Sequence, residues 1–411
     1  MLLYEQELKN ISSPKADTLK RVEEAVESVR TELKGEGDMK AVGIAYENAD
    51  LFEIKEFAQF LNQNFKKIVV IGIGGSSLGA RTLLALKPNN NVIVAENIDS
   101  FSVSILFNSL DLKETGFLAV SKSGKTIECI SQTLILMKKI EEELGQDAIA
   151  KHFFFLTEDK ESPITNLANE FGIKTFEHHK TVGGRFSYLS NTGLLPAAIA
   201  GLNIDEIRQG AVNTIDEVLN NKNNFITKIV ASQIELTENG IVANVVMPYI
   251  DRLQTFTEWY KQLWAESLGK GGKGTIPVSV SGTIDQHSQL QLFMDGPQNK
   301  FYTFIYKDKD KDSLKIEKAY NDGFKYLENL TLDDIMKIEF DSTVEVLNKR
   351  KLPIRIINFK EINERSLSQL LMQYILETIL FGRATGTNPF GQPSVEERKI
   401  LAREMMTDFK K

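Results

Sequence analysis

The sequence predicts an α/β protein made of two doubly wound units in tandem, each with a mainly parallel sheet between two layers of helices. Short β-branched or aromatic runs alternate with amphipathic segments between residues 66 and 159, which favours parallel strands joined by helical crossovers. A second series of such runs follows the linker-like segment GLNID, which begins at Gly201. The length of 411 residues is enough for two or three domains.

The elements follow one another in order. From Ser12 to about Leu61, spaced apolar residues predict helices. Strands are predicted at KKIVVIGIG, NVIVAEN, GFLAVSKSG and KHFFFLTED in the first unit, and at IVANVVMPY, GTIPVSVSG, KFYTFIYKD and LPIRIINF in the second. Helices are predicted at IECISQTLILMKKIEEEL and from Gln254 to Leu268, and a solvated loop at KDKDKDSLKIEK. We expect an N-terminal helical arm over residues 1–45, units over 46–200 and 201–380, and a C-terminal helical tail over 381–411.

Composition narrows the class of function. The chain has 49 Lys and Arg against 56 Asp and Glu, a net charge of −7, and no sustained basic run, so nucleic acid is not expected as the main partner. The only cysteine is Cys129, which excludes disulfides within the chain and cysteine zinc sites and favours a reducing compartment. No apolar run is long enough to cross a bilayer, and the start MLLYEQELKN lacks a secretory apolar region. We expect a cytoplasmic protein.

The stretch IVVIGIGGSSLG joins a predicted strand to a glycine-rich turn that should open a helix. Such a turn suits an anion, because glycine lets the backbone approach and helix amides can donate to it. Gly72 and Gly74 fit a dinucleotide fingerprint, but Ser77 stands at the third glycine position. Glu96 lies where a ribose-binding acid could stand. An NAD-dependent oxidoreductase therefore remains an alternative from this stretch alone.

A second turn, SKSGKT at residues 121–126, follows the next predicted strand. Gly124-Lys125-Thr126 imitates the end of a P-loop, but Ala119 stands where that motif needs its first glycine. The hydroxyl side chains and backbone amides of this turn suit a terminal phosphate, although helix capping alone would use the same residues. Two such turns after adjacent strands favour one compact monophosphate.

Three later stretches supply ionisable groups. Arg185 follows two glycines in TVGGRFS. Glu266 stands one helical turn after Gln262. Both tryptophans of the chain lie in the same segment, so we expect apolar surroundings that would raise the pKa of the carboxyl. His287 follows Asp285 and Gln286, which could fix its tautomer. Taken singly, each of these residues could equally be structural.

Together these stretches resemble the phosphoglucose isomerase family. The matching segments are VIGIGGSSLG, VSKSGKTIE, VGGRFSYLSNTGLLP, QLWAESLGK, GTIDQHSQLQLFMDGP and NPFGQPSVEERK, in the family's order from about Ile68 to Lys399. The chain departs from the family pattern at Lys125, where threonine is common, and at Glu397 and Arg398, where smaller or apolar residues are usual. The resemblance implies two sugar isomerase (SIS) domains of the αβα type.

The resemblance also implies the substrate and its binding residues. The substrate is glucose 6-phosphate or fructose 6-phosphate, interconverted in glycolysis and gluconeogenesis. Its phosphate would be held by a set of hydroxyl, amide and cationic groups with glycine leaving room: Gly75, Ser76, Ser121, Lys122, Ser123 and Thr126. Gln392 would help to hold the phosphate or to position the segment that carries Lys399.

The catalytic residues implied by the resemblance are Glu266, His287, Lys399 and Arg185. Glu266 matches the base that moves a proton between C1 and C2, and Arg185 the cation that offsets the cis-enediolate. His287 and Lys399 match the pair that opens the sugar ring. No cofactor or metal is implied, and relatives are homodimers in which the histidine reaches across from the second subunit. Two alternatives stay open: a bifunctional phosphoglucose/phosphomannose isomerase, and a sugar-phosphate sensor without catalysis.

Overall fold

The computed structural model describes residues 2–33, 35, 37–220, 224–310 and 312–409. Its first sheet has five strands in the order β3 (Val92–Ala95), β2 (Lys67–Ile71), β4 (Thr115–Val120), β5 (Phe153–Thr157) and β6 (Lys174–Glu177). All neighbouring strands are parallel. The four predicted strands of this unit are confirmed, whereas β6 is a short, largely exposed edge strand that the sequence pattern did not predict.

The second sheet also has five strands, in the order β1 (Tyr4–Lys9), β10 (Ile354–Phe359), β9 (Lys300–Lys307), β7 (Ala243–Pro248) and β8 (Ile276–Ser279). The four strands predicted for this unit are parallel to one another, and β1 joins them as an antiparallel edge strand. The expectation of a wholly helical N-terminal arm is therefore wrong at its start. Residues 4–9 pair with β10, at the far end of the sequence.

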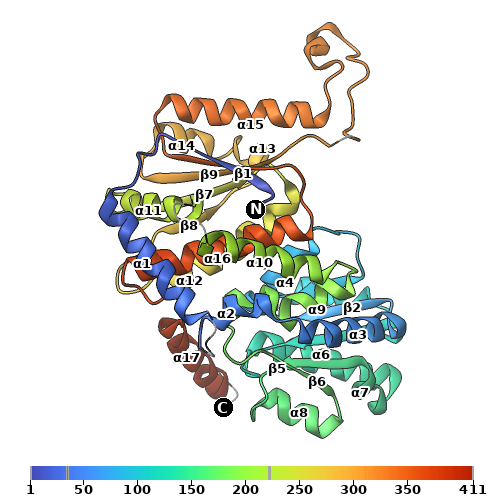
Figure 1. Cartoon of the computed structure of the whole chain (residues 1–411). Coiled ribbons are helices and arrows are strands. Elements are labelled where there is room, and N and C mark those ends of the chain that lie inside the picture. Colours follow the sequence, from blue (N-terminus) through green and yellow to red (C-terminus); the bar gives the residue numbers. More distant parts are fainter. Residues whose placement is uncertain (1, 34, 36, 221–223, 311, 410–411) are drawn as a thin grey trace.

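Helices cover both sheets and fill the space between them (Figure 1). They are α1 (Ala16–Glu32), α2 (Lys40–Gly43), α3 (Ala49–Asn64), α4 (Leu78–Leu84), α5 (Ser100–Asn108), α6 (Ile127–Leu144), α7 (Ile149–His152), α8 (Pro163–Phe171), α9 (Asn191–Ile199), α10 (Ile204–Asn220), α11 (Phe225–Glu238), α12 (Gln254–Leu268), α13 (Gly282–Asp285), α14 (Leu290–Asp295), α15 (Leu332–Lys349), α16 (Glu364–Ala384) and α17 (Pro393–Phe409). No helix among the described residues is long and apolar enough to cross a membrane.

Helix α16 lies at the centre of the molecule and packs against α1, α10, α11 and α12. Its sequence is apolar around most of its circumference, which is typical of a buried helix, and a capping box formed by Asn363 and Ser366 starts it. Inside, Glu377 accepts two hydrogen bonds from Arg355 of β10, at 3.0 and 2.7 Å, and both side chains are fully buried. Gln6 of β1 accepts from the same guanidinium. The N-terminal strand is thus tied to the core by both its sheet pairing and a side chain.

Two segments lie outside this packed body. The chain from β9 to α15 extends away from the second sheet as the orange excursion in Figure 1, and the charged run within it is mostly exposed, as predicted; Lys311 of that run lies outside the described residues. At the other end of the chain, α17 confirms the expected C-terminal helix. Some residues of the expected units lie outside the described residues: 1, 34 and 36 of the arm, 221–223 of the second unit, and 410 and 411 of the tail. Helix α17 lies against the rim of the cavity described next.

Candidate active site

A cavity of about 1000 Å³ lies at the carboxyl ends of β2 and β4, and this volume suits a small ligand. In the first sheet the chain passes from β2 to β3 on one side and then to β4 on the other. Open α/β sheets bind ligands at such a reversal of strand order. The two predicted anion turns, residues 72–77 after β2 and 121–126 after β4, therefore meet at this point.

The 72–77 turn is packed tightly against the segment that carries Arg185. A Cβ atom on Gly75 would lie 2.4 Å from the carbonyl carbon of Gly184, so only glycine fits at this crossing. Ser187 reinforces the contact, because its hydroxyl donates to the carbonyl oxygen of Gly75 at 3.0 Å. Gly75 and Ser76 line the cavity. The close approach places the guanidine-bearing segment directly beside the first turn.

The 121–126 turn opens helix α6. Gly124 has φ +62° and faces Ser162 too closely for a side chain. Ser123 and Thr126 line the cavity, and the Ser123 hydroxyl accepts from the amide of Lys125 at 3.2 Å. Ser121 differs from the expectation: it is fully buried and does not line the cavity, and its hydroxyl donates to that of Thr126 at 2.9 Å. Ser121 thus braces the turn from behind.

Lys122 lines the cavity, but its ammonium group already has protein partners. It donates to the carbonyl oxygens of Lys180 and Val182 at 2.9 and 3.0 Å and forms an ion pair with Glu158 at 3.5 Å. Burial lowers its pKa, and the charge of Glu158 opposes that change. Lys122 therefore ties the 121–126 turn to residues 180–182 while adding positive charge to the cavity.

Arg185 is the most heavily bonded side chain of the site, with a side chain only 3% exposed. Its Nε donates to Ser267 at 2.8 Å, Nη1 to Gln392 at 2.6 Å and to Glu266 at 3.3 Å, and Nη2 to the carbonyl oxygens of Pro389 and Gly391. A guanidinium has five N–H donors, so these five acceptors use its whole capacity. Burial lowers its pKa, and Glu266 works in the opposite sense.

Glu266 stands on the last turn of α12 at the wall of the cavity, and 27% of its side chain is exposed. Its other partner is Gln262, whose amide nitrogen donates to it at 3.0 Å. The expectation of apolar surroundings from the two tryptophans is wrong. Trp259 and Trp264 are buried and donate their indole N–H groups to the carbonyl of Arg185 and to Thr275, so the carboxylate has polar neighbours instead.

His287 does not line this cavity. It is exposed between α13 and α14, beside the second sheet. Its expected partners form hydrogen bonds with other residues. Asp285 accepts from the backbone amide of Ser281 and from the hydroxyl of Ser288. Gln286 accepts from the hydroxyl of Tyr249 and donates to Glu339. The expectation that Asp285 and Gln286 fix the tautomer of His287 is therefore wrong.

Gln392 and Lys399 enter the cavity from the C-terminal segment. Lys399 lies on α17 and forms an ion pair with Glu396 of the same helix at 2.6 Å. Gln262 and Arg403 are among the further cavity residues to which the sequence analysis gave no role. Gln262 could have been found from its position one turn before Glu266, whereas Arg403 gives no signal before the helix is placed.

The structure also bears on the dinucleotide alternative. Glu96, the residue that could hold a ribose, accepts a hydrogen bond from Ser77 at 2.5 Å and pairs with Arg81 at 2.6 Å. Both partners belong to the loop and helix that follow β2, so Glu96 fixes the 72–77 turn. Among the described residues, no group of three or more His, Cys, Asp or Glu side chains is placed to hold a metal ion.

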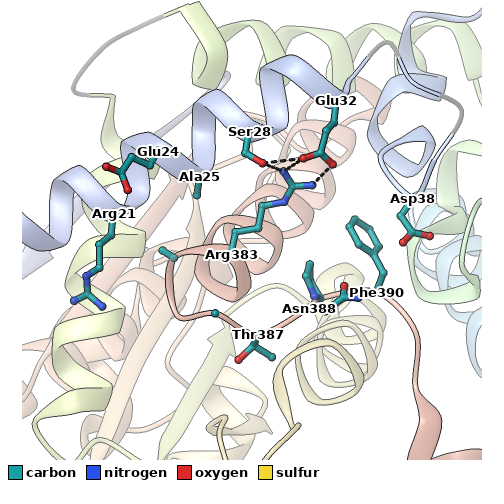
Figure 2. A pocket seen from close by; sticks show the side chains of 13 residues that line it. Arg21, Glu24, Ala25, Ser28, Glu32, Asp38, Arg383, Thr387, Asn388 and Phe390 are labelled. Carbon is teal, nitrogen blue, oxygen red and sulfur yellow. Dashed lines mark hydrogen bonds and ion pairs between the residues drawn. The ribbon is translucent and has the colours of Figure 1, made fainter.

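Figure 2 shows a second hollow, about 620 Å³ in volume, between α1 and the segment 383–390. Arg383 donates here to Ser28 and to both carboxylate oxygens of Glu32. Lys270, in the loop after α12, donates to the carbonyl oxygens of Asn388 and Phe390 of the same segment, each at 2.7 Å. Segment 383–390 is thus bonded both to α1 and to the loop after α12.

The family model and a sequence relative point to one family, and solved structures share the fold. The family model described as phosphoglucose isomerase matches residues 50–411. A probable glucose-6-phosphate isomerase from Methanococcus maripaludis is 31% identical over 97% of this chain and 91% of its own length. Among solved structures, a hypothetical protein from Thermus thermophilus matches with a TM-score of 0.87 and 28% identity over 98% of this chain and 100% of that one. A glucose-6-phosphate isomerase from Chlamydia trachomatis has a TM-score of 0.82, 21% identity and coverage of 96% and 86%.

Proposed function

The chain belongs to the phosphoglucose isomerase family, and from this premise we propose that it interconverts glucose 6-phosphate and fructose 6-phosphate in glycolysis and gluconeogenesis. The observation that carries the proposal is the joint placement of Glu266, Arg185 and two anion turns around one cavity. A phosphate bound at one end of such a cavity would hold the sugar carbons near the carboxylate. Positioning of this kind lowers the barrier without any contact that changes during the reaction.

The phosphate is held by the two turns at the ends of β2 and β4. Ser76, Ser123 and Thr126 supply hydroxyl groups at the cavity surface, and the start of α6 supplies amides and the positive end of its dipole. Lys122 adds charge from below the turn, and Gln392 closes the site from the C-terminal segment. Ser121 acts through Thr126, because its own hydroxyl is buried.

The isomerisation moves two protons within the sugar, one from C2 to C1 and one from O2 to O1. Glu266 removes the proton from C2 of the open aldose, which leaves a cis-enediolate. The hydroxyl proton on O2 passes to O1, and Glu266 returns its own proton to C1 as the C2–O bond becomes the ketone carbonyl. Negative charge develops on oxygen in the transition state, and Arg185 offsets it. Because all five N–H donors of Arg185 have protein acceptors, this residue contributes mainly through its fixed charge.

Ring opening uses His287 and Lys399 as the proton-transfer pair. Since His287 lies outside the cavity of its own chain, the histidine comes from a second copy, and the working form is a homodimer with shared sites. The reaction needs no cofactor. The chain has a single cysteine, which favours a reducing compartment, and we place the enzyme in the cytoplasm.

The proposal is tested by a coupled assay that follows glucose 6-phosphate formed from fructose 6-phosphate, with EDTA present. Wild type is expected to turn over, and Glu266→Gln to lose at least about a thousandfold in kcat because it lacks the base. Glu258→Gln is the matched control, since Glu258 lies on the same helix, pairs with Lys261 and lies outside the cavity lining. It should keep wild-type activity.

Other outcomes identify the alternatives. Binding of fructose 6-phosphate without turnover by wild type would support a sensor and contradict the isomerase. Turnover of mannose 6-phosphate in the same assay would extend the activity to a bifunctional isomerase.

The shared site is tested by mixing two inactive variants, His287→Ala and Glu266→Gln, under conditions that exchange subunits. Random exchange makes half of the dimers mixed, and each mixed dimer has one site with both native residues, so about a quarter of wild-type activity should return. No recovery after proven exchange, or full activity where wild type sediments as a monomer, would contradict the shared site.

A further inference from the structure

Helix α17 carries Lys399 but has little packing of its own. Within the described helix, Pro393–Phe409, no residue is buried, and Ile400, Leu401 and Met405 are more than half exposed. Lys399 pairs with Glu396 on the same helix, so this ion pair does not fix the lysine relative to the cavity. The placement of Lys399 therefore depends on what holds the helix as a whole.

One contact joins α17 to the 121–126 turn. Nη2 of Arg403 donates to the carbonyl oxygen of Lys125 at 3.3 Å. Arg403 follows Lys399 by four residues, so the two side chains lie on the same face of the helix, and both line the cavity. The bond therefore runs from the turn of helix that presents Lys399 to the backbone of the predicted phosphate site.

The carbonyl that accepts this bond belongs to a peptide group whose N–H could bind an anion. The carbonyl of Lys125 and the N–H of Thr126 are parts of one planar trans peptide, so they point in opposite directions. The Thr126 N–H lies at the start of α6, where an anion would bind, and in this structure it donates to Ser121 at 3.4 Å. Any rotation that turns this N–H toward a bound phosphate also reorients the oxygen that Arg403 holds.

We propose that Arg403 is a positioning residue that couples phosphate binding at the 121–126 turn to the placement of Lys399. The inference rests on the proposed function, in which this turn holds the substrate phosphate and Lys399 takes part in ring opening. Arg403 itself acts through the backbone of Lys125 and through α17. The substrate phosphate thereby helps to assemble the group that opens its own ring.

Hydrogen–deuterium exchange of the full-length protein, with inorganic phosphate as the probe, tests the coupling directly. In wild type, phosphate should slow exchange in both the 121–126 turn and α17. In Arg403→Ala the turn should still be protected, but α17 should exchange at the same rate with and without phosphate. Lys125→Ala, which keeps the backbone carbonyl, should retain the protection of α17.

Kinetics supply a second readout. Arg403→Ala should lower kcat about tenfold, the rate equivalent of one lost hydrogen bond from a charged group, with less than a twofold change in KM. Arg403→Lys should recover most of the loss, because it restores a cationic donor. Glu404→Ala, one residue further on the exposed helix, is the matched control and should resemble wild type.

The outcomes separate the two proposals. Protection of the turn without protection of α17 in wild type would overturn the coupling and leave the phosphate site intact. No protection of either segment would remove the phosphate site and the coupling with it. An unchanged kcat in Arg403→Ala would also contradict the positioning role.

Discussion

Arg185 and Lys399 line the same cavity but are held in opposite ways. Arg185 is buried, bonds two side chains of α12 and residues 389–392, and uses every donor that it has. Lys399 stands on an exposed helix, and its ion-pair partner, Glu396, lies one turn earlier on the same helix. One half of the site is thus built into the core, and the other half is attached to its surface.

The difference matches the roles that we propose for the two groups. A charge that stabilises an enediolate works best when it is fixed before the reaction, since no energy is then spent on reorienting it. A proton donor for ring opening has to admit a cyclic sugar and then approach its oxygen. Movement of α17 would supply that step at small cost, because the helix breaks few contacts when it shifts.

Among the changes that test this comparison, a substitution of Arg185 should have the largest effect on activity and stability. Arg185→Lys removes the forked geometry and leaves several buried acceptors without donors, so kcat/KM should fall by about a thousandfold and the free energy of unfolding by about 3 kcal/mol. Urea unfolding and the coupled assay measure the two effects. Arg81→Lys is the control, because its partly exposed pair with Glu96 should contribute no more than about 1 kcal/mol. Loss of activity with unchanged stability would contradict a core-built charge.

A change at Lys399 should separate activity from stability. Lys399→Met is expected to lower kcat by about a hundredfold through the loss of proton transfer, while the free energy of unfolding stays within about 0.5 kcal/mol of wild type because the site is on the surface. Ile400→Ala, at an exposed neighbouring position, serves as control and should be close to wild type in both measurements. A clear drop in stability of Lys399→Met would show that α17 is anchored more firmly than its contacts indicate.

The smallest effect at neutral pH is expected from a change at His178, which is buried like Arg185. Burial lowers the pKa of His178 to about 4, and the nearby charge of Lys122 acts in the same direction. The unfolded chain binds a proton at this residue below about pH 6.5, while the folded protein does so only near pH 4. Stability should therefore fall as the pH drops from 6.5 to 4, by up to about 3 kcal/mol from this residue.

The measurement is urea unfolding of wild type and His178→Gln at a series of pH values between 7 and 4. The variant lacks the titrating group, so its stability should decline less steeply over this interval. Equal slopes for the two proteins would show that His178 does not carry the acid sensitivity.

Much of the fold could be predicted because its strands are buried and apolar. The eight predicted strands belong to parallel ladders, where continuous apolar runs are expected. The two strands that were missed, β1 and β6, are edge strands of mixed polarity, YEQELK and KTFE. Strand β1 pairs with a strand that is distant in sequence, and β6 lies at an exposed edge of its sheet. Neither situation produces a periodic pattern of apolar residues in the sequence.

The site was predictable where a residue type and its neighbours act locally. The two turns, Arg185 and Glu266 meet in one cavity as their positions after strands and on a helix suggest. The sequence did not predict which side chains point into the core. Ser121 is buried, and so are the tryptophans near Glu266. These details depend on packing between segments far apart in the chain, which local spacing does not encode.

The pairing of β1 with β10 also has a consequence for how the chain is made. Tyr4–Lys9 lies opposite Ile354–Phe359, so β1 cannot reach its partner until the more than 300 residues between them have been synthesised. The first sheet, contained within residues 67–177, can form much earlier, since domains generally fold as units during synthesis. Contacts of such long range are also slow to form. During translation the N-terminal strand should therefore remain exposed to chaperones, and its docking should be among the last steps of maturation.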